Sequence, residues 1–126
     1  MEDWEFNFEW QRVRHLVKNT LGTGALPDMN GLLFLIGMQE LGRIQAVFSK
    51  EEKQDLMHLA VCRLLVYDHI YEFVGRDDDG WPHYKKIATI PATGEAAQER
   101  FLQERAIQYF KDWEAQHTED SSTPPD

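Results

Sequence analysis

The chain has 126 residues, of which 42% are hydrophobic and 12% aromatic, so it is long enough and apolar enough to fold as one domain with its own core. Its 22 acidic and 13 basic side chains give a formal net charge of −9. This charge repels phosphate backbones and anionic lipid surfaces, so we expect neither a nucleic acid nor a membrane as partner. The only cysteine, Cys62, excludes an intramolecular disulfide and a cysteine-rich zinc framework.

We expect neither an export signal nor a membrane segment in this sequence. Its first residues, MEDWEFNFEW, are acidic, whereas a signal peptide begins with a basic region that an apolar core follows. The longest apolar run, GLLFLIGM, is closed by Gln39 and Glu40 and is too short to cross a bilayer. We therefore expect a soluble, cytoplasmic protein, and no motif indicates a cofactor.

The first element is ambiguous between a strand and a helix. The stretch WEFNFEW alternates aromatic and polar residues, which is the period of a strand. From Phe6 onward, however, apolar residues recur at steps of four or three as far as Leu21, which is one face of a helix. We predict a helix from about Trp4 to Leu21 that Gly22 stops.

The second helix is predicted from Met29 to about Ala46, with Asp28 or Asn30 as its N-cap. Its apolar residues are too many to face one partner, so it is either the central helix of a bundle or partly buried against another subunit. Gly37 would permit the close approach of a neighbouring backbone.

The third helix begins with a capping box, in which Ser49 and Glu52 satisfy each other's backbone amides. Its predicted core-facing row is Leu56, Ala60, Leu64 and Tyr67.

A β-hairpin is predicted between residues 70 and 87, where aromatic and β-branched residues replace the helical pattern. A four-residue loop, 77–80, gives better cross-strand pairs than a two-residue loop at 79–80. The pairs in this register are Arg76–Trp81, Phe73–Tyr84, Glu72–Lys85 and Ile70–Ile87.

A fourth helix follows from about Glu95 to Gln116, with Thr93 or Gly94 as its cap, and residues 117–126 are predicted to form a disordered tail. The predicted fold is therefore mainly α. It is a four-helix bundle-like single domain, residues 1–116, with a β-hairpin inserted between helices 3 and 4.

The stretch GRDDDGWPHY holds the main candidates for chemistry. Asp77 and Asp79 are candidate ligands of a divalent metal, but an EF-hand is excluded because the aspartates are contiguous and the twelfth residue from Asp77 is Ala88. The structural alternative is that aspartate supports the turn by bonding its own backbone, while Gly80 adopts a positive φ.

The same stretch contains an aromatic and cationic cluster. The candidate ligand-binding residues are Arg76, Trp81, His83 and Tyr84, with Arg76 as an anion contact. The alternative is that Trp81 covers the end of the bundle and His83 is solvated.

One further pair has a spacing that suits a metal. His58 and Cys62 lie four residues apart, but nothing in the sequence places a third ligand beside them, so we favour a buried structural cysteine. No catalytic residue is assigned, because no phosphate-binding loop, GxSxG or HExxH motif occurs.

The stretches GLLFLIGMQELG, SKEEKQDLMHLAVCRLL and GRDDDGWPHY together resemble a family of small uncharacterised bacterial proteins, from Gly31 to Phe110. The resemblance implies that the helix with SKEEKQDLMH and the hairpin with WPHY are features of that family. It implies no activity and no site residue.

Three functions are compatible with these observations. The first is a non-enzymatic domain that contacts itself, as a homodimer, or another protein. The second is a small-ligand or divalent-metal protein, with or without enzymatic activity, that uses the hairpin at residues 76–84. The third is an acidic, immunity-type protein that neutralises a basic partner. The candidate interface residues are Trp4, Phe6, Phe8, Trp10, Leu33 and Phe34.

Overall fold

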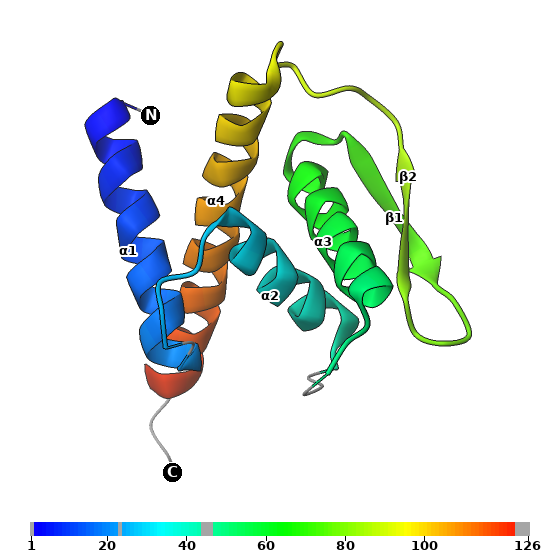
Figure 1. Ribbon diagram of the computed structural model, residues 1–126, viewed down its shortest axis with the longest axis horizontal. Helices are drawn as coiled ribbons and strands as arrows, with labels where there is room; N and C mark the ends of the chain where they lie inside the picture. Colours follow the sequence, from blue (N-terminus) through cyan, green and yellow to red (C-terminus); the bar gives the residue numbers. More distant parts are fainter. Residues whose placement is uncertain (1, 23, 44–46, 123–126) are drawn as a thin grey trace.

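The computed structural model describes residues 2–22, 24–43 and 47–122, with side chains as far as residue 116. Within these ranges it contains four α-helices, and an antiparallel hairpin lies between the third and the fourth, which confirms the predicted mainly α fold (Figure 1). None of the helices described is long and apolar enough to span a membrane. The elements are α1 (Asp3–Leu21), α2 (Met29–Leu41), α3 (Lys50–Leu65), the 3-10 turn η1 (Val66–Asp68), β1 (Tyr71–Arg76), β2 (Pro82–Lys86) and α4 (Glu95–Ser122).

α1 lies alongside α4, and the two helices run in the same direction (Figure 1). The helical interpretation of the N-terminal stretch is confirmed, since Phe6, Val13 and Val17 form the buried face. Gly22 ends the helix in the left-handed conformation, with φ of 63°, and its amide donates to the carbonyl of Lys18 at 2.9 Å.

α2 begins as predicted and ends earlier than predicted. Asp28 is the N-cap, and its carboxylate accepts the amide of Gly31 at 2.8 Å. The helix stops at Leu41 and not near Ala46 because Gly42 is left-handed, with φ of 79°, and donates its amide to the carbonyl of Met38. Residues 44–46 of the predicted helix lie outside the described residues.

α2 is the central helix, because it lies between two hydrophobic clusters. The first cluster joins all four helices and includes Leu32, Leu33 and Ile36 of α2. The second cluster lies between α2, α3 and the hairpin, and it has Leu41, Phe48, Leu56 and Leu59 at its centre. The apolar residues of α2 are therefore accounted for within one chain.

α3 begins with the predicted capping box: the Glu52 amide donates to Ser49 Oγ at 3.1 Å, and the Ser49 amide donates to the Glu52 carboxylate at 2.9 Å. The first three residues of its predicted row, Leu56, Ala60 and Leu64, are fully buried.

The predicted hairpin register is confirmed in one half and wrong at the tip. Phe73 pairs with Tyr84, and Glu72 pairs with Lys85, as predicted. A bulge between Phe73 and Gly75, where Gly75 adopts a φ of 137°, then shifts the register by one residue. Arg76 therefore faces Pro82 and not Trp81.

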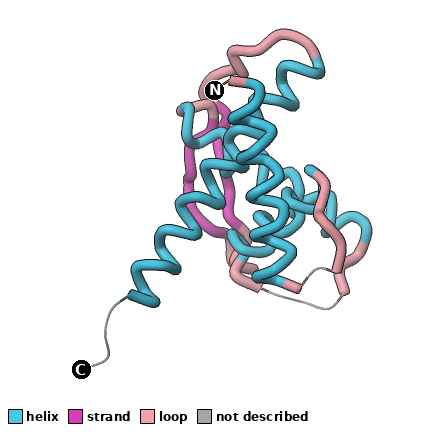
Figure 2. Tube along the Cα trace, turned by 90° about the vertical axis from the view of Figure 1, so that its left-hand side faces the viewer, coloured by secondary structure: helices cyan, strands magenta, loops and turns pink. Residues whose placement is uncertain are grey.

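α4 starts directly after Gly94, one of the two predicted caps, and continues to Ser122. It thus extends past Gln116 into the predicted tail, because neither glycine nor proline occurs between residues 95 and 122 to stop the backbone hydrogen bonds. Figure 2 shows these last turns of α4 extending beyond the other helices. Residues 123–126 of the predicted tail lie outside the described part of the chain.

Candidate functional site

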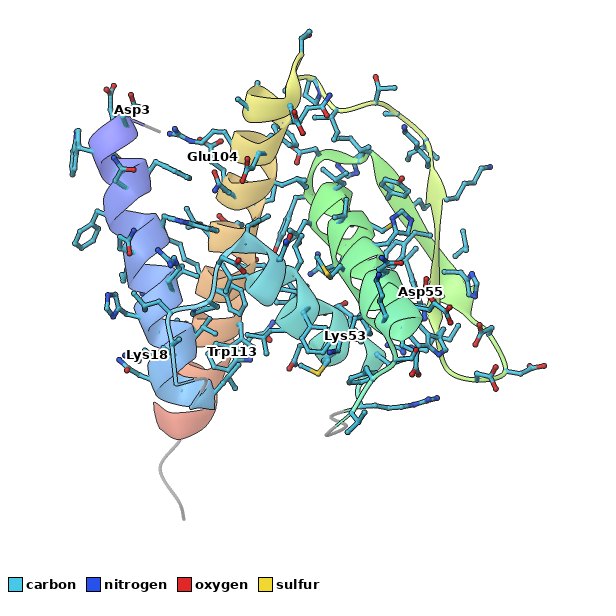
Figure 3. All side chains as sticks on the ribbon, in the orientation of Figure 1. Asp3, Lys18, Lys53, Asp55, Glu104 and Trp113 are labelled. Carbon is cyan, nitrogen blue, oxygen red and sulfur yellow. The ribbon has the colours of Figure 1, made fainter. Side chains whose placement is uncertain are left out.

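A groove of about 430 Å³ separates α3 from the hairpin. It brings together predicted site residues that are distant in the sequence. Asp55 marks its α3 wall near the N-terminal end of that helix (Figure 3). The other lining residues are His58, Leu59 and Cys62 of α3 and Tyr71, Asp77, Trp81, Pro82, His83 and Tyr84 of the hairpin.

Asp77 organises the tip of the hairpin. One oxygen of its carboxylate accepts the amides of Asp79 at 2.9 Å and Trp81 at 3.0 Å, and the other lies 2.9 Å from Nε2 of His83. The hydrogen bond to His83, followed by those from the backbone, lowers the pKa of Asp77. Gly80 adopts the predicted positive φ, 88°. Asp77 thus supports the turn by accepting backbone amides of its own loop, which is the structural alternative to metal binding.

The metal interpretation of the loop gains no support from this geometry. Both carboxylate oxygens of Asp77 are engaged, and Asp79 does not line the groove. Among the residues that the structure describes, no group of three or more His, Cys, Asp or Glu side chains is placed to hold a metal ion.

Arg76 anchors the hairpin to α2. Its guanidinium donates to the carbonyl of Gly80 and to that of Glu40, each at 2.9 Å. Glu40 lies in the last turn of α2, where carbonyls have no partner within the helix. Arg43 donates in the same way to the carbonyl of Asp79. Arg76 therefore does not line the groove with Trp81 and His83, and it shares a second hollow with Tyr84 instead.

His58 and Cys62 lie in the groove, with Nε2 and Sγ 3.6 Å apart. Burial raises the pKa of the Cys62 thiol, so the thiol is protonated at neutral pH and is not an activated nucleophile. Trp81 and Tyr84 also pack on the second hydrophobic cluster, so both residues have a structural role as well as lining the groove.

The six candidate interface residues divide into exposed and buried sets. Trp4 and Phe8 are 71% and 63% exposed on α1. The other four belong to the chain's own core or pack against it: Phe6 and Leu33 are buried, and Trp10 and Phe34 are half-buried.

A polar network between α2, α3 and α4 was not predicted. The Arg63 guanidinium lies 5.1 and 5.3 Å from the ring centres of Tyr67 and Tyr109 and 3.3 Å from the Glu40 carboxylate. The Tyr109 hydroxyl donates to Glu40 at 2.8 Å, and that of Tyr67 to Asp112 at 2.9 Å. Burial, together with Asp112, raises the pKa of Tyr67 to about 12. The signal in the sequence was the presence of tyrosine and not phenylalanine in apolar helical rows, since a buried hydroxyl needs a partner.

The arginines of this acidic chain are all engaged in contacts within the chain. Arg12 pairs with Glu9 and Glu114, and Arg100 with Asp3 and Glu104. The remaining contacts are Arg14 to the Pro27 carbonyl, Arg105 to Asp68, and those of Arg43, Arg63 and Arg76 described above. The 22 acidic side chains outnumber the 13 lysines and arginines, and this net negative charge suits cationic partners.

Comparisons with protein-family models, with curated proteins and with solved structures find no match to this chain. Its function is therefore inferred from the placement of its residues. Two surfaces are candidates: the groove between α3 and the hairpin, and the aromatic pair on α1 formed by Trp4 and Phe8.

Proposed function

We propose that this protein acts by binding another protein through the N-terminal half of α1, and not by catalysis. The supporting observation is the exposure of Trp4 and Phe8. Because they are four residues apart, the two rings are neighbours on one face of the helix. This face is opposite to the one that buries Phe6 and Val13 against α4. Exposed aromatic residues of this kind are typical anchors of protein contacts.

The exposed area of the pair indicates the kind of contact. Fully buried aromatic side chains cover roughly 150–250 Å² each, so at these exposures the two rings present on the order of 300 Å². A stable dimer buries about 800 Å² per partner. The pair is therefore the apolar centre of a wider contact that includes the polar residues around it.

Those surrounding residues indicate a basic partner. Glu2 and Asp3 are exposed at the N-terminal end of α1, although Asp3 is paired with Arg100 (Figure 3). Glu5, three residues before Phe8 on the same side of the helix, is half-buried. A second copy of the chain would bring the same carboxylates together, which opposes association. The apolar residues of α2, which suggested a homodimer, are buried in the chain's own core or half-buried against it. A basic partner protein is therefore favoured over a homodimer.

The proposal is tested with an immobilised amphipathic peptide of leucine and lysine, beside the same peptide with glutamate in place of lysine. We expect the protein to bind only the lysine peptide, and the double variant Trp4→Ser/Phe8→Ser to bind it at least tenfold more weakly. The matched control is Phe73→Ser/Val74→Ser, which removes an exposed apolar pair from β1. Equal losses in both variants, or no loss in the α1 variant, would contradict the proposal. Sedimentation of the wild type as a concentration-dependent dimer would favour self-association instead.

A further inference from the structure

We propose that the groove between α3 and the hairpin is a second binding site, which takes a positively charged amine or guanidine group on an apolar body. Asp55 is the counter-ion of this group, and Trp81 supplies an aromatic wall. The site is distinct from the aromatic pair on α1, and the two proposals can fail separately.

The sign of the charge follows from the residues that line the groove. Neither lysine nor arginine is among them, in the part of the chain that the structure describes. The charged groups are the carboxylates of Asp55 and Asp77. The other titratable side chains with nitrogen are two histidines: His58, which lies 3.6 Å from the Cys62 sulfur, and His83, whose charge when protonated is balanced by Asp77 at 2.9 Å. An anion would therefore find like charge and no cationic partner in the groove, whereas a cation finds a counter-ion.

The two carboxylates have different roles. Asp77 already accepts two backbone amides and contacts His83, so its oxygens are used by the hairpin. Asp55 is exposed near the start of α3, and no residue described in this structure forms a hydrogen bond or ion pair with its side chain. Asp55 is thus the carboxylate that is free to accept an N–H group of a ligand in a charge-assisted hydrogen bond.

The walls of the groove suit a cation with an apolar body. Trp81, Tyr71 and Tyr84 are half-buried aromatic residues, and the face of an indole or phenol ring attracts an ammonium or guanidinium group. Leu59 and Pro82 are buried and make the remaining surface apolar. A volume of about 430 Å³ lies in the range of sites that bind small molecules or side chains.

The groove is also fixed before any ligand binds. Asp77 holds both the amide of Trp81 and the ring of His83, and Arg76 ties the loop to the C-terminal end of α2. Trp81 packs on the second hydrophobic cluster. The hairpin therefore loses little conformational entropy when a ligand binds, which favours affinity.

The experiment is an NMR titration of the full chain with benzylamine and, separately, with benzoate, which carries the opposite charge on a similar ring. The chain has four tryptophans, and the indole signal of Trp81 is identified by its loss in Trp81→Phe. We expect benzylamine to shift this signal and benzoate to leave it unchanged. Asp55→Asn should weaken benzylamine binding about tenfold, since it removes one charge-assisted hydrogen bond. Asp55 is exposed, so this variant is expected to fold.

The matched control is Asp78→Asn, which removes an exposed loop carboxylate that does not line the groove. Equal weakening in both variants would show that only the overall charge matters and would overturn the proposal. So would an unchanged affinity in Asp55→Asn, an equal shift with benzoate, or shifts confined to Trp4. The double variant Trp4→Ser/Phe8→Ser should bind benzylamine as the wild type does.

The amine can come from a free small molecule or from a basic side chain of a protein. Titrations with 1,5-diaminopentane and with a capped glycine–lysine–glycine peptide distinguish these sources. A preference of at least tenfold for either probe, lost in Asp55→Asn, supports the site and identifies its source. Failure of both probes to shift the Trp81 signal would count against it.

Discussion

Two helix pairs in this protein are held together in different ways. α2 and α3 approach each other at the level of the backbone, because a Cβ atom on Gly37 would lie only 2.7 Å from the carbonyl carbon of Leu56. Ile36 and Leu56, next to this contact, are fully buried. The geometry of this junction is therefore set by the absence of a side chain and by close apolar packing.

α1 and α4 are joined by side chains instead. Phe6 stacks on Trp10 within α1, and from α4 the Arg100 guanidinium lies 3.6 Å from the ring centre of Phe6. Ion pairs border this apolar stripe: Arg12 bridges Glu9 and Glu114 at 3.0 Å each, and Lys111 lies 3.6 Å from Glu9. The proposed partner surface is on α1, whose attachment therefore responds to charge and pH, whereas the α2–α3 junction responds to steric change.

The largest expected effect is that of Gly37→Ala. The added methyl group cannot avoid the α3 backbone, so we expect a loss of about 3 kcal/mol in the free energy of unfolding, measured by urea denaturation. The control is Gly22→Ala at the end of α1, where the same methyl group meets open space and only the positive φ of 63° is unfavourable. That variant should lose about 1–2 kcal/mol. Equal losses of stability in the two variants would mean that the close approach of the α3 backbone at Gly37 adds nothing to the cost of the substitution.

An intermediate loss of stability is expected at the contact of α4 with α2, where a hydrogen bond supplements apolar packing. Burial and the nearby Glu40 carboxylate raise the pKa of Tyr109 well above its usual range, so its hydroxyl remains protonated and donates to Glu40 at 2.8 Å. Tyr109→Phe keeps the ring and removes this bond, and we expect a loss of about 1.5 kcal/mol. Calorimetric unfolding of this variant beside the wild type checks the result. An unchanged stability in Tyr109→Phe would mean that Arg63 alone satisfies Glu40.

The elements that the sequence predicted correctly are those with local signals. The capping box at Ser49 and Glu52 depends on a four-residue pattern, and the helical face of α1 on a period of 3.6. The early end of α2 also has a local signal, Gly42, although the predicted helix continues to about Ala46. A glycine permits the left-handed conformation that ends a helix but does not require it, so the pattern alone did not fix the end.

The candidate site was predictable only in part, because it is made by contacts between distant segments. The WPHY stretch indicated Trp81, His83 and Tyr84, and the structure places all three beside α3. Nothing local could show that Asp55 and Cys62 would face them or that Arg76 would instead bond the carbonyl of Glu40. The bulge that redirects Arg76 depends on the positive φ of Gly75, which a glycine permits but does not require.

The smallest expected effect is a dependence of the free energy of unfolding on pH, which arises at the α1–α4 junction. Burial alone would raise the pKa of Glu9, but the hydrogen bond from Arg12 and the charges of Lys111 and Arg12 outweigh it and hold this pKa below the usual 4.5. The pKa is therefore lower in the folded chain than in the unfolded one. The resulting stabilisation is complete above about pH 4.5 and is lost as the pH falls through the folded value.

Glu9→Gln should thus be less stable than the wild type by under about 1 kcal/mol near neutral pH, and this difference should shrink as the solution is acidified below about pH 4.5. Urea unfolding across that range measures it. Glu99→Gln is the control, since Glu99 is exposed on α4 and has no ion-pair partner among the described residues, so its effect on stability should be small. A difference for Glu9→Gln that stays constant in acid would mean that the ion pairs do not hold α1 on α4. Apolar packing would then hold both junctions, and the attachment of the proposed partner surface on α1 would not depend on pH.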